Sequence, residues 1–131
     1  MTGDGGGAQE AVGVLVVEDD VDILRAIVQV LEDEDITVRA AENGRDALAV
    51  LRAPGAQRPR VILLDLMMPI MDGWAFRAEQ LRDPTLADIP VIVLTADGRA
   101  AEKTGMMKGA GALRKPVDLL TLLAALRPFL G

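Results

Sequence analysis

The chain alternates short, continuous apolar runs with longer amphipathic segments. The run at 12–17 reads Val-Gly-Val-Leu-Val-Val and is apolar at nearly every position, which is typical of a strand buried on both faces. Similar short runs at 36–40, 60–64, 89–94 and 111–114 predict four more strands. The pattern therefore indicates a sheet that is covered on both sides.

The segments between the apolar runs have the spacing and the end signals of helices. The predicted helices span about 20–34, 44–51, 74–82, 99–108 and 119–130. Asp19 or Asp20 can cap the first helix and Asp118 the last, whereas Gly105 and Gly109 weaken the fourth. Strands that alternate with helices in this way favour a parallel sheet with helices on both faces.

Length and composition are consistent with a single domain. The chain has 131 residues, and we expect the domain to span 12–131 after a flexible, Gly-rich tail at 1–11. Hydrophobic residues make up 50% of the chain and aromatic residues only 2%, so aliphatic side chains must fill the core. Because no apolar run has the length of a membrane span and the start lacks a signal-peptide layout, we expect a cytoplasmic protein with no membrane partner.

The chain contains few of the residue types that usually carry out chemistry. The chain has no Cys and no His, which excludes disulfides, thiol nucleophiles and the commonest zinc ligand. Its formal net charge of −6 argues against a nucleic-acid partner, because nucleic-acid binding requires a cationic surface. Carboxylates, hydroxyls, lysine and arginine remain available for chemistry.

Acidic side chains gather where the predicted strands end. In an open parallel sheet, ligands bind beyond the carboxyl ends of the strands. Glu18, Asp19 and Asp20 follow the first strand and Asp65 follows the third, so at least three carboxylates share one crevice if these strands are neighbours. Such a cluster repels itself unless a cation lies within it. Oxygen ligands alone favour Mg²⁺, Mn²⁺ or Ca²⁺.

A hydroxyl and an ammonium come to the same edge of the sheet. Thr95 ends the fourth predicted strand and Lys115 the fifth. A carboxylate nucleophile, a divalent metal, a hydroxyl and an ammonium together suit the formation of an aspartyl phosphate. Taken singly, the acids could be helix caps, Asp65 a turn residue and Lys115 a solvated surface charge. The joint pattern favours a site.

Four sequence runs together resemble the signature motifs of bacterial response-regulator receiver domains, the phosphorylation switches of two-component systems. The runs are VLVVEDD at 14–20, LLDLMMPIMDG at 63–73, VLTA at 93–96 and LRKP at 113–116. The likeness extends from about 12 to 130 and keeps the four motifs in order. It implies an α/β flavodoxin-like (βα)₅ fold, a doubly wound parallel sheet of strand order 2-1-3-4-5.

The resemblance also implies a phosphoacceptor and a metal site. Asp65 would accept the phosphoryl group. Glu18 and Asp19 would hold Mg²⁺ directly or through water, together with Asp65, and the backbone carbonyl of Met67 would complete the metal ligands.

Two further residues are implied to contact the phosphoryl group. Thr95 would donate a hydrogen bond to it and Lys115 would form an ion pair with it, and the Lys115–Pro116 bond is expected to be cis. Receiver domains usually carry Tyr or Phe where this chain has Ala112, and that ring swings inward on phosphorylation. We expect the chemistry to survive this change. Output would then travel through Thr95 and the 99–108 segment, or through another face.

These residues predict a signalling switch that catalyses its own phosphorylation and dephosphorylation rather than a metabolic enzyme. Asp65 would attack the phosphohistidine of a histidine kinase or of a histidine phosphotransfer protein, or a small phosphodonor such as acetyl phosphate. Because the chain ends with its last helix, we expect a stand-alone phosphorelay protein that acts on a downstream protein target.

The last predicted helix is apolar nearly all round. Because a surface helix cannot bury both faces, some of Leu119, Leu122 and Leu126 should be exposed. In the receiver family the first helix commonly docks the histidine kinase, and the last commonly mediates dimers or output contacts. The apolar face therefore indicates either an interface, such as a homodimer contact, or a wide core stripe, with equal support for both.

Three alternative functions fit less well. A pseudo-receiver, an interaction module that is never phosphorylated, is disfavoured by the intact acids, Thr95 and Lys115, although Ala112 is consistent with altered output. A haloacid-dehalogenase phosphatase has a second Asp two residues after its nucleophile, where this chain has Met67. A dinucleotide-binding domain needs a G-x-G-x-x-G motif after the first strand, and none is present.

Overall fold

The computed structural model describes residues 12–96 and 111–130. In chain order, the elements are β1 (Val14–Val17), α2 (Val21–Asp33), β2 (Val38–Ala41), α3 (Gly44–Arg52), β3 (Val61–Asp65), α4 (Gly73–Arg82), β4 (Val91–Thr95), β5 (Gly111–Arg114) and α6 (Leu119–Leu130). The tail predicted at 1–11 and the helix predicted at 99–108 lie outside the described residues. Within the described ranges, no helix is both long enough and apolar enough to cross a membrane.

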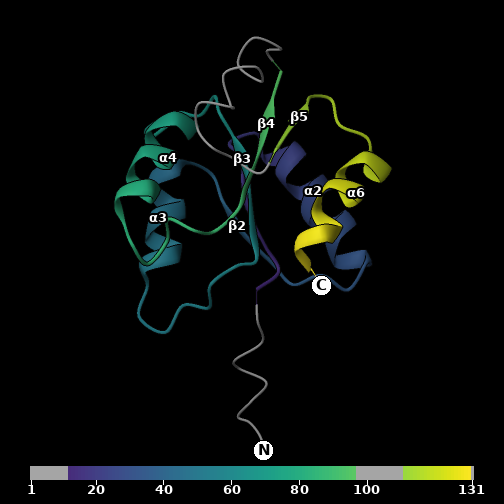
Figure 1. Ribbon diagram of the computed structural model, residues 1–131. Coiled ribbons are helices and arrows are strands. Elements are labelled where there is room, and N and C mark those ends of the chain that lie inside the picture. The colour runs from purple at the N-terminus through teal and green to yellow at the C-terminus, as the bar shows by residue number, and fades with distance from the viewer. Residues whose placement is uncertain (1–11, 97–110, 131) are drawn as a thin grey trace, which may run out of the picture.

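The five strands form one parallel sheet in the order β2-β1-β3-β4-β5 (Figure 1). Val14 pairs with Val38 of β2 and with Val61 of β3, so β1 lies between them. The strand order reverses between β1 and β3, and in such sheets ligands bind at the carboxyl ends on either side of that point. The flavodoxin-like fold class and the strand order predicted from the sequence are confirmed.

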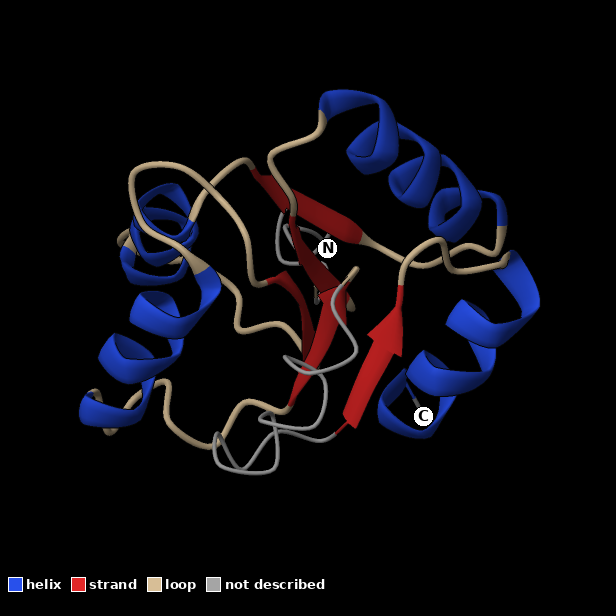
Figure 2. Ribbon diagram, turned by 90° about the horizontal axis from the view of Figure 1, so that it is seen from above, coloured by secondary structure: helices blue, strands red, loops and turns tan. Residues whose placement is uncertain are grey.

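Helices cover both faces of the sheet. In Figure 1, α3 and α4 lie on one side and α2 and α6 on the other, and Figure 2 shows the same three layers from above. Because neighbouring strand residues point to opposite faces, the apolar residues divide into two cores. Leu15 and Leu64 pack toward α3 and α4 with Phe76, whereas Val16 packs toward α2 and α6 with Leu126. This two-sided burial explains the continuous apolar runs of the strands.

Short polar side chains begin the helices, as the sequence predicts. The carboxylate of Asp20 accepts the N–H groups of Asp22 and Ile23 and so caps α2. The carboxylate of Asp118 accepts the N–H of Thr121 at 2.8 Å in the first turn of α6. Each cap satisfies backbone donors that have no partner inside the helix.

The bounds of four strands differ by one or two residues from the sequence prediction. β1 begins at Val14 rather than at 12, β2 spans Val38–Ala41 rather than 36–40, β3 spans Val61–Asp65 rather than 60–64, and β4 spans Val91–Thr95 rather than 89–94. The chain leaves α2 through Asp35, which has a positive φ of 60°, and the N–H of Ile36 donates to the carbonyl of Leu31 at 3.0 Å. Because this hydrogen bond commits Ile36 to the end of the helix, the sheet pairing of β2 starts after it.

The apolar helix α6 buries one face and exposes part of the other. Leu122 and Leu126 are buried, whereas Leu119 and Leu120 are 46% and 78% exposed. The expectation that some leucines of this helix are exposed is therefore correct for Leu119. Leu122 and Leu126 belong to the core.

Candidate functional site

The carboxyl ends of four strands bring the predicted site residues to one edge of the sheet. Glu18 directly follows β1, Asp65 is the last residue of β3 and Thr95 is the last residue of β4. Lys115 directly follows β5, and its N–H donates to the carbonyl of Thr95 at 2.9 Å. The backbone geometry of a parallel sheet therefore places these side chains at the same end of neighbouring strands.

Three carboxylates form a tight cluster at this edge. Glu18, Asp19 and Asp65 each offer an oxygen, and these oxygens all lie within 4.8 Å of one another. Glu18 and Asp65 are buried, and Asp19 is partly exposed. Negative charges so close together in a partly desolvated site repel each other strongly. The cluster therefore needs positive charge to be stable when all three groups are ionised.

The carboxyl group of Asp65 responds to this environment. Burial raises its pKa most, and contact with the Glu18 carboxyl raises it further, to about 7. Two groups act in the opposite direction: the N–H of Met67, which donates to Asp65 Oδ1 at 3.2 Å, and the charge of Lys115. Asp65 therefore changes its charge near neutral pH.

Lys115 supplies one positive charge to the cluster. Its Nζ lies 2.5 Å from Glu18 Oε1 and 3.4 Å from Asp65 Oδ2. Burial disfavours the charged ammonium, but the contacts with Glu18 and Asp65 outweigh burial and raise the pKa of Lys115. One ammonium against three carboxylates leaves two negative charges without a counterion among these groups.

The donor atoms of the cluster fit a divalent cation. Glu18 Oε1 is buried, and its contact among the described residues is the ion pair with Lys115. A site made only of oxygen ligands, with two uncompensated negative charges, suits a hard divalent cation. The buried acidic cluster could therefore bind a metal.

The loop after β3 is held tightly against the end of that strand. A Cβ atom on Gly73 would lie 2.6 Å from the carbonyl oxygen of Asp65 and 2.8 Å from the Cα of Leu66. The N–H of Gly73 donates to the carbonyl of Leu66 at 3.0 Å. Only glycine allows the first turn of α4 to approach the strand end so closely.

A second glycine holds the other end of the same loop. The N–H of Gly44 donates to the carbonyl of Met71 at 2.9 Å, and a Cβ on Gly44 would lie 2.8 Å from Met71 Cγ. Between these anchors, Met67 and Ile70 are 71% and 74% exposed. The anchoring role of the two glycines was not predicted from the sequence, although an Asn-Gly and an Asp-Gly pair at the starts of helices could have indicated close packing.

Two features that follow from the proposed resemblance lie on the β5 side. The Lys115–Pro116 peptide bond is cis, as expected. Ala112 is exposed on β5 and pairs in register with Val93 of β4. This position has no aromatic ring, so an inward ring movement is not available to this chain.

Comparisons with known proteins agree with these features. The family model for the response regulator receiver domain matches residues 14–127. The chain is 33% identical over 120 residues to protein PilH of Pseudomonas aeruginosa, covering 90% of this chain and 97% of PilH. It is 39% identical over 116 residues to the response regulator PleD of Caulobacter vibrioides, covering 87% of this chain but only 25% of PleD.

Solved structures show the same fold. The chemotaxis response regulator CheY4 of Vibrio cholerae superposes with a TM-score of 0.81 at 28% identity, over 92% of this chain and all of CheY4. The family match spans the whole sheet and all residues of the acidic site. The chain therefore belongs to the response regulator receiver domain family of two-component systems.

Proposed function

We propose that this chain is a phosphorylation switch whose phosphoacceptor is Asp65. The observation that carries the proposal is the position of this carboxylate: it ends β3 beside the switch point, among Glu18, Asp19 and Lys115. The donor would be the phosphohistidine of a histidine kinase or of a histidine phosphotransfer protein, or a small phosphodonor. Membership of the receiver family supports this assignment.

The acidic cluster would hold Mg²⁺. Glu18, Asp19 and Asp65 would supply carboxylate oxygens, directly or through water, and the backbone carbonyl of Met67 would complete the set. Mg²⁺, when bound, supplies positive charge that offsets the charge developing on the phosphoryl oxygens. The two negative charges that Lys115 leaves uncompensated support a divalent ion in this place.

Side chains of the protein would carry out the phosphoryl transfer itself. An oxygen of the Asp65 carboxylate forms a bond to phosphorus while the bond from phosphorus to the donor breaks. The ammonium of Lys115, 3.4 Å from Asp65 Oδ2, neutralises a phosphoryl oxygen, and the hydroxyl of Thr95 donates a hydrogen bond to another. Hydrolysis of the phosphorylated Asp65 returns the switch to its starting state.

Receiver domains act with histidine kinases and with downstream targets. Because the chain spans only a quarter of PleD, the activity of that whole protein does not transfer to it. Homodimer formation through α6 is supported by the exposed Leu119 and Leu120. The cytoplasmic location remains a prediction.

Intact-mass analysis after incubation with acetyl phosphate tests the phosphoacceptor. We expect the wild type to gain the mass of one phosphoryl group with Mg²⁺ but not with EDTA, and Asp65→Asn to gain none. Asp33→Asn is the matched control, because Asp33 is exposed near the end of α2 and contacts only Gln29 among the hydrogen bonds found there. It should be labelled like the wild type.

Two results would contradict the proposal. Full labelling of Asp65→Asn would show that another residue is the acceptor. If neither acetyl phosphate nor a panel of phosphorylated histidine kinases labels the wild type, the chain is a pseudo-receiver.

A further inference from the structure

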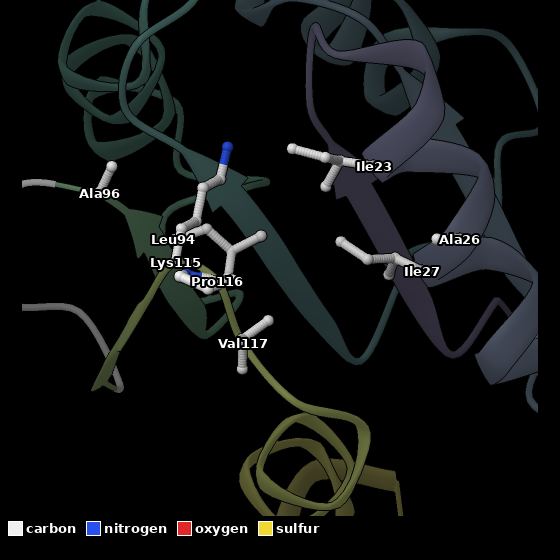
Figure 3. Close-up of a pocket in the computed structure, with 8 residues that line it drawn as sticks. All are labelled: Ile23, Ala26, Ile27, Leu94, Ala96, Lys115, Pro116 and Val117. Atoms are coloured by element: carbon white, nitrogen blue, oxygen red, sulfur yellow. The ribbon is translucent and has the colours of Figure 1, made fainter.

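A mostly apolar pocket of about 480 Å³ lies beside the acidic site, between α2 and the segment that follows β5. One wall carries Ile23, Ala26 and Ile27, and the other carries Lys115, Pro116 and Val117. Figure 3 shows the isoleucines pointing from α2 across the pocket, with the ammonium of Lys115 at one end. The pocket and the phosphoacceptor site therefore share one residue.

The shared lysine makes the pocket amphipathic. The Lys115 side chain lines the apolar space, while its Nζ contacts Glu18 and Asp65. A volume of about 480 Å³ is in the usual range for small-molecule sites, which are mainly apolar with a few convergent polar groups. A fitting molecule would thus carry an anionic end at Lys115 and a short apolar body between α2 and Val117.

The reactive groups of the chain narrow the chemical class of this molecule. When a phosphate ester donates its phosphoryl group, the leaving group is an alkoxide. An alkoxide is strongly basic, so its departure needs a proton from a general acid. The chain has no His and no Cys to supply one, and the ammonium of Lys115 is held in ion pairs with Glu18 and Asp65. An acyl phosphate leaves as a carboxylate, which is stable without a proton. The chemistry at this site therefore favours an acyl phosphate over a phosphate ester.

We infer that the pocket binds the alkyl chain of a short-chain acyl phosphate, so that propionyl and butyryl phosphate are better phosphodonors than acetyl phosphate. The inference rests on the proposed function of Asp65. In the transfer, a carboxylate oxygen of Asp65 bonds to phosphorus while the bond from phosphorus to the acyl oxygen breaks. The electron pair leaves with the carboxylate product, and no proton, oxidant or reductant is consumed.

Binding of unreactive alkylphosphonates tests the pocket without group transfer. The dissociation constants of methyl-, propyl- and butylphosphonate would be measured by calorimetry in the presence of Mg²⁺. For the wild type we expect each additional buried methylene to tighten binding about fourfold. Equal affinity for the three alkylphosphonates overturns the inference. The pocket would then be a binding site for an apolar side chain of a protein partner.

A variant that fills the pocket sharpens this test. Ala26 lines the pocket from an exposed position on α2, so Ala26→Leu adds volume there without disturbing the core, and leucine is a good helix former. Ala124→Leu is the matched control, since Ala124 is exposed on α6. Ala26→Leu should lose the chain-length dependence and Ala124→Leu should keep it. Retention of the dependence in Ala26→Leu overturns the inference.

Rates of labelling with acyl phosphates separate this inference from the proposed function. With Mg²⁺ present, we expect butyryl phosphate to phosphorylate Asp65 at several-fold lower concentration than acetyl phosphate. Equal half-saturating concentrations overturn the inference and leave the proposed function intact. No labelling by either compound overturns the inference and also counts against Asp65 as a phosphoacceptor for small donors.

Discussion

The two sides of the acidic site are built differently. On the side of α3 and α4, the loop after β3 is anchored by Gly44 and Gly73, and a single added Cβ would collide with its backbone. On the side of α2 and α6, the chain leaves an apolar pocket of about 480 Å³. The tight side fixes the position of Asp65 and its neighbours. The open side leaves a cavity against the side chain of Lys115.

The largest effect should come from filling the tight side. Gly73→Ala places a Cβ 2.6 Å from the Asp65 carbonyl oxygen, and because backbone atoms cannot move aside cheaply, we expect a loss of about 3 kcal/mol in the free energy of unfolding. Urea denaturation measures it.

Gly111→Ala is the control for this substitution. Nothing lies within 4 Å of the position of its Cβ, so its stability should change little. If both alanine variants were equally stable, the anchoring of the loop by Gly73 would be wrong.

The second effect concerns the free energy that is needed to ionise the Asp65 carboxyl group in the folded protein. Its pKa is raised to about 7 from an ordinary value of 3.8, so the folded state holds this proton more tightly than the unfolded chain does. The contribution of this tighter proton binding to the free energy of unfolding is fully present below pH 3.8 and is lost as the pH rises through 7. In the absence of metal, Asp65→Asn should therefore be more stable than the wild type at pH 8, by about 2 kcal/mol.

Thermal or urea unfolding of both proteins at pH 5 and pH 8, in EDTA, checks this expectation. The advantage of Asp65→Asn should shrink toward pH 5, where Asp65 of the wild type is mostly protonated. An advantage that does not depend on pH would point to a cause other than the charge of Asp65.

The same titration should control metal binding. A carboxylate binds a cation in its deprotonated form, and the pKa of Asp65 is about 7. We therefore expect the affinity for Mg²⁺ to fall about threefold, about 0.7 kcal/mol, between pH 7.5 and pH 6.5. The quenching or shift of Trp74 fluorescence on Mg²⁺ addition, or calorimetry, would measure the affinity.

Asp65→Asn serves as the reference for this measurement, because its side chain does not titrate. Its residual affinity for Mg²⁺ should be weak and nearly constant over the same pH range. An equal pH dependence in both proteins would assign the titration to another group.

The smallest effect concerns strain within the anchored loop. Ile70 has a φ of 68° and is 74% exposed, and a β-branched residue is unfavourable in this left-handed region. Ile70→Gly should stabilise the fold by about 0.5 to 1 kcal/mol, since relief of strain exceeds the added freedom of the unfolded chain. Ile36→Gly, at a partly buried position without a positive φ, should destabilise it in the same unfolding assay.

The sequence predicted most of the frame because that frame depends on local information. Burial on two faces makes the strands continuous apolar runs, and short acids such as Asp20 and Asp118 begin helices wherever they occur at the right place. The strand order followed from the resemblance, whereas the grouping of carboxylates followed from their positions at the ends of the first and third strands. Their closeness in space follows from the parallel arrangement of strands.

What escaped prediction depends on contacts between distant segments. The start of β2 follows from the hydrogen bond of Ile36 to Leu31, and no apolar pattern encodes it. The contact of Gly44 with Met71 joins residues from two different helix starts. The pocket exists because α2 and the segment after β5 remain apart, a spacing that neither segment specifies alone.

The sheet also acts as a partition between two independent cores. Neighbouring residues of one strand, such as Val16 and Val17, belong to different apolar clusters on opposite faces. The effects of substitutions in the two clusters on the free energy of unfolding should be additive, because the two clusters share no side chains. One layer can therefore drift through evolution, or be redesigned for a new partner, while the other stays unchanged. At the carboxyl ends of the strands the two layers meet, so a substitution there affects both layers at once.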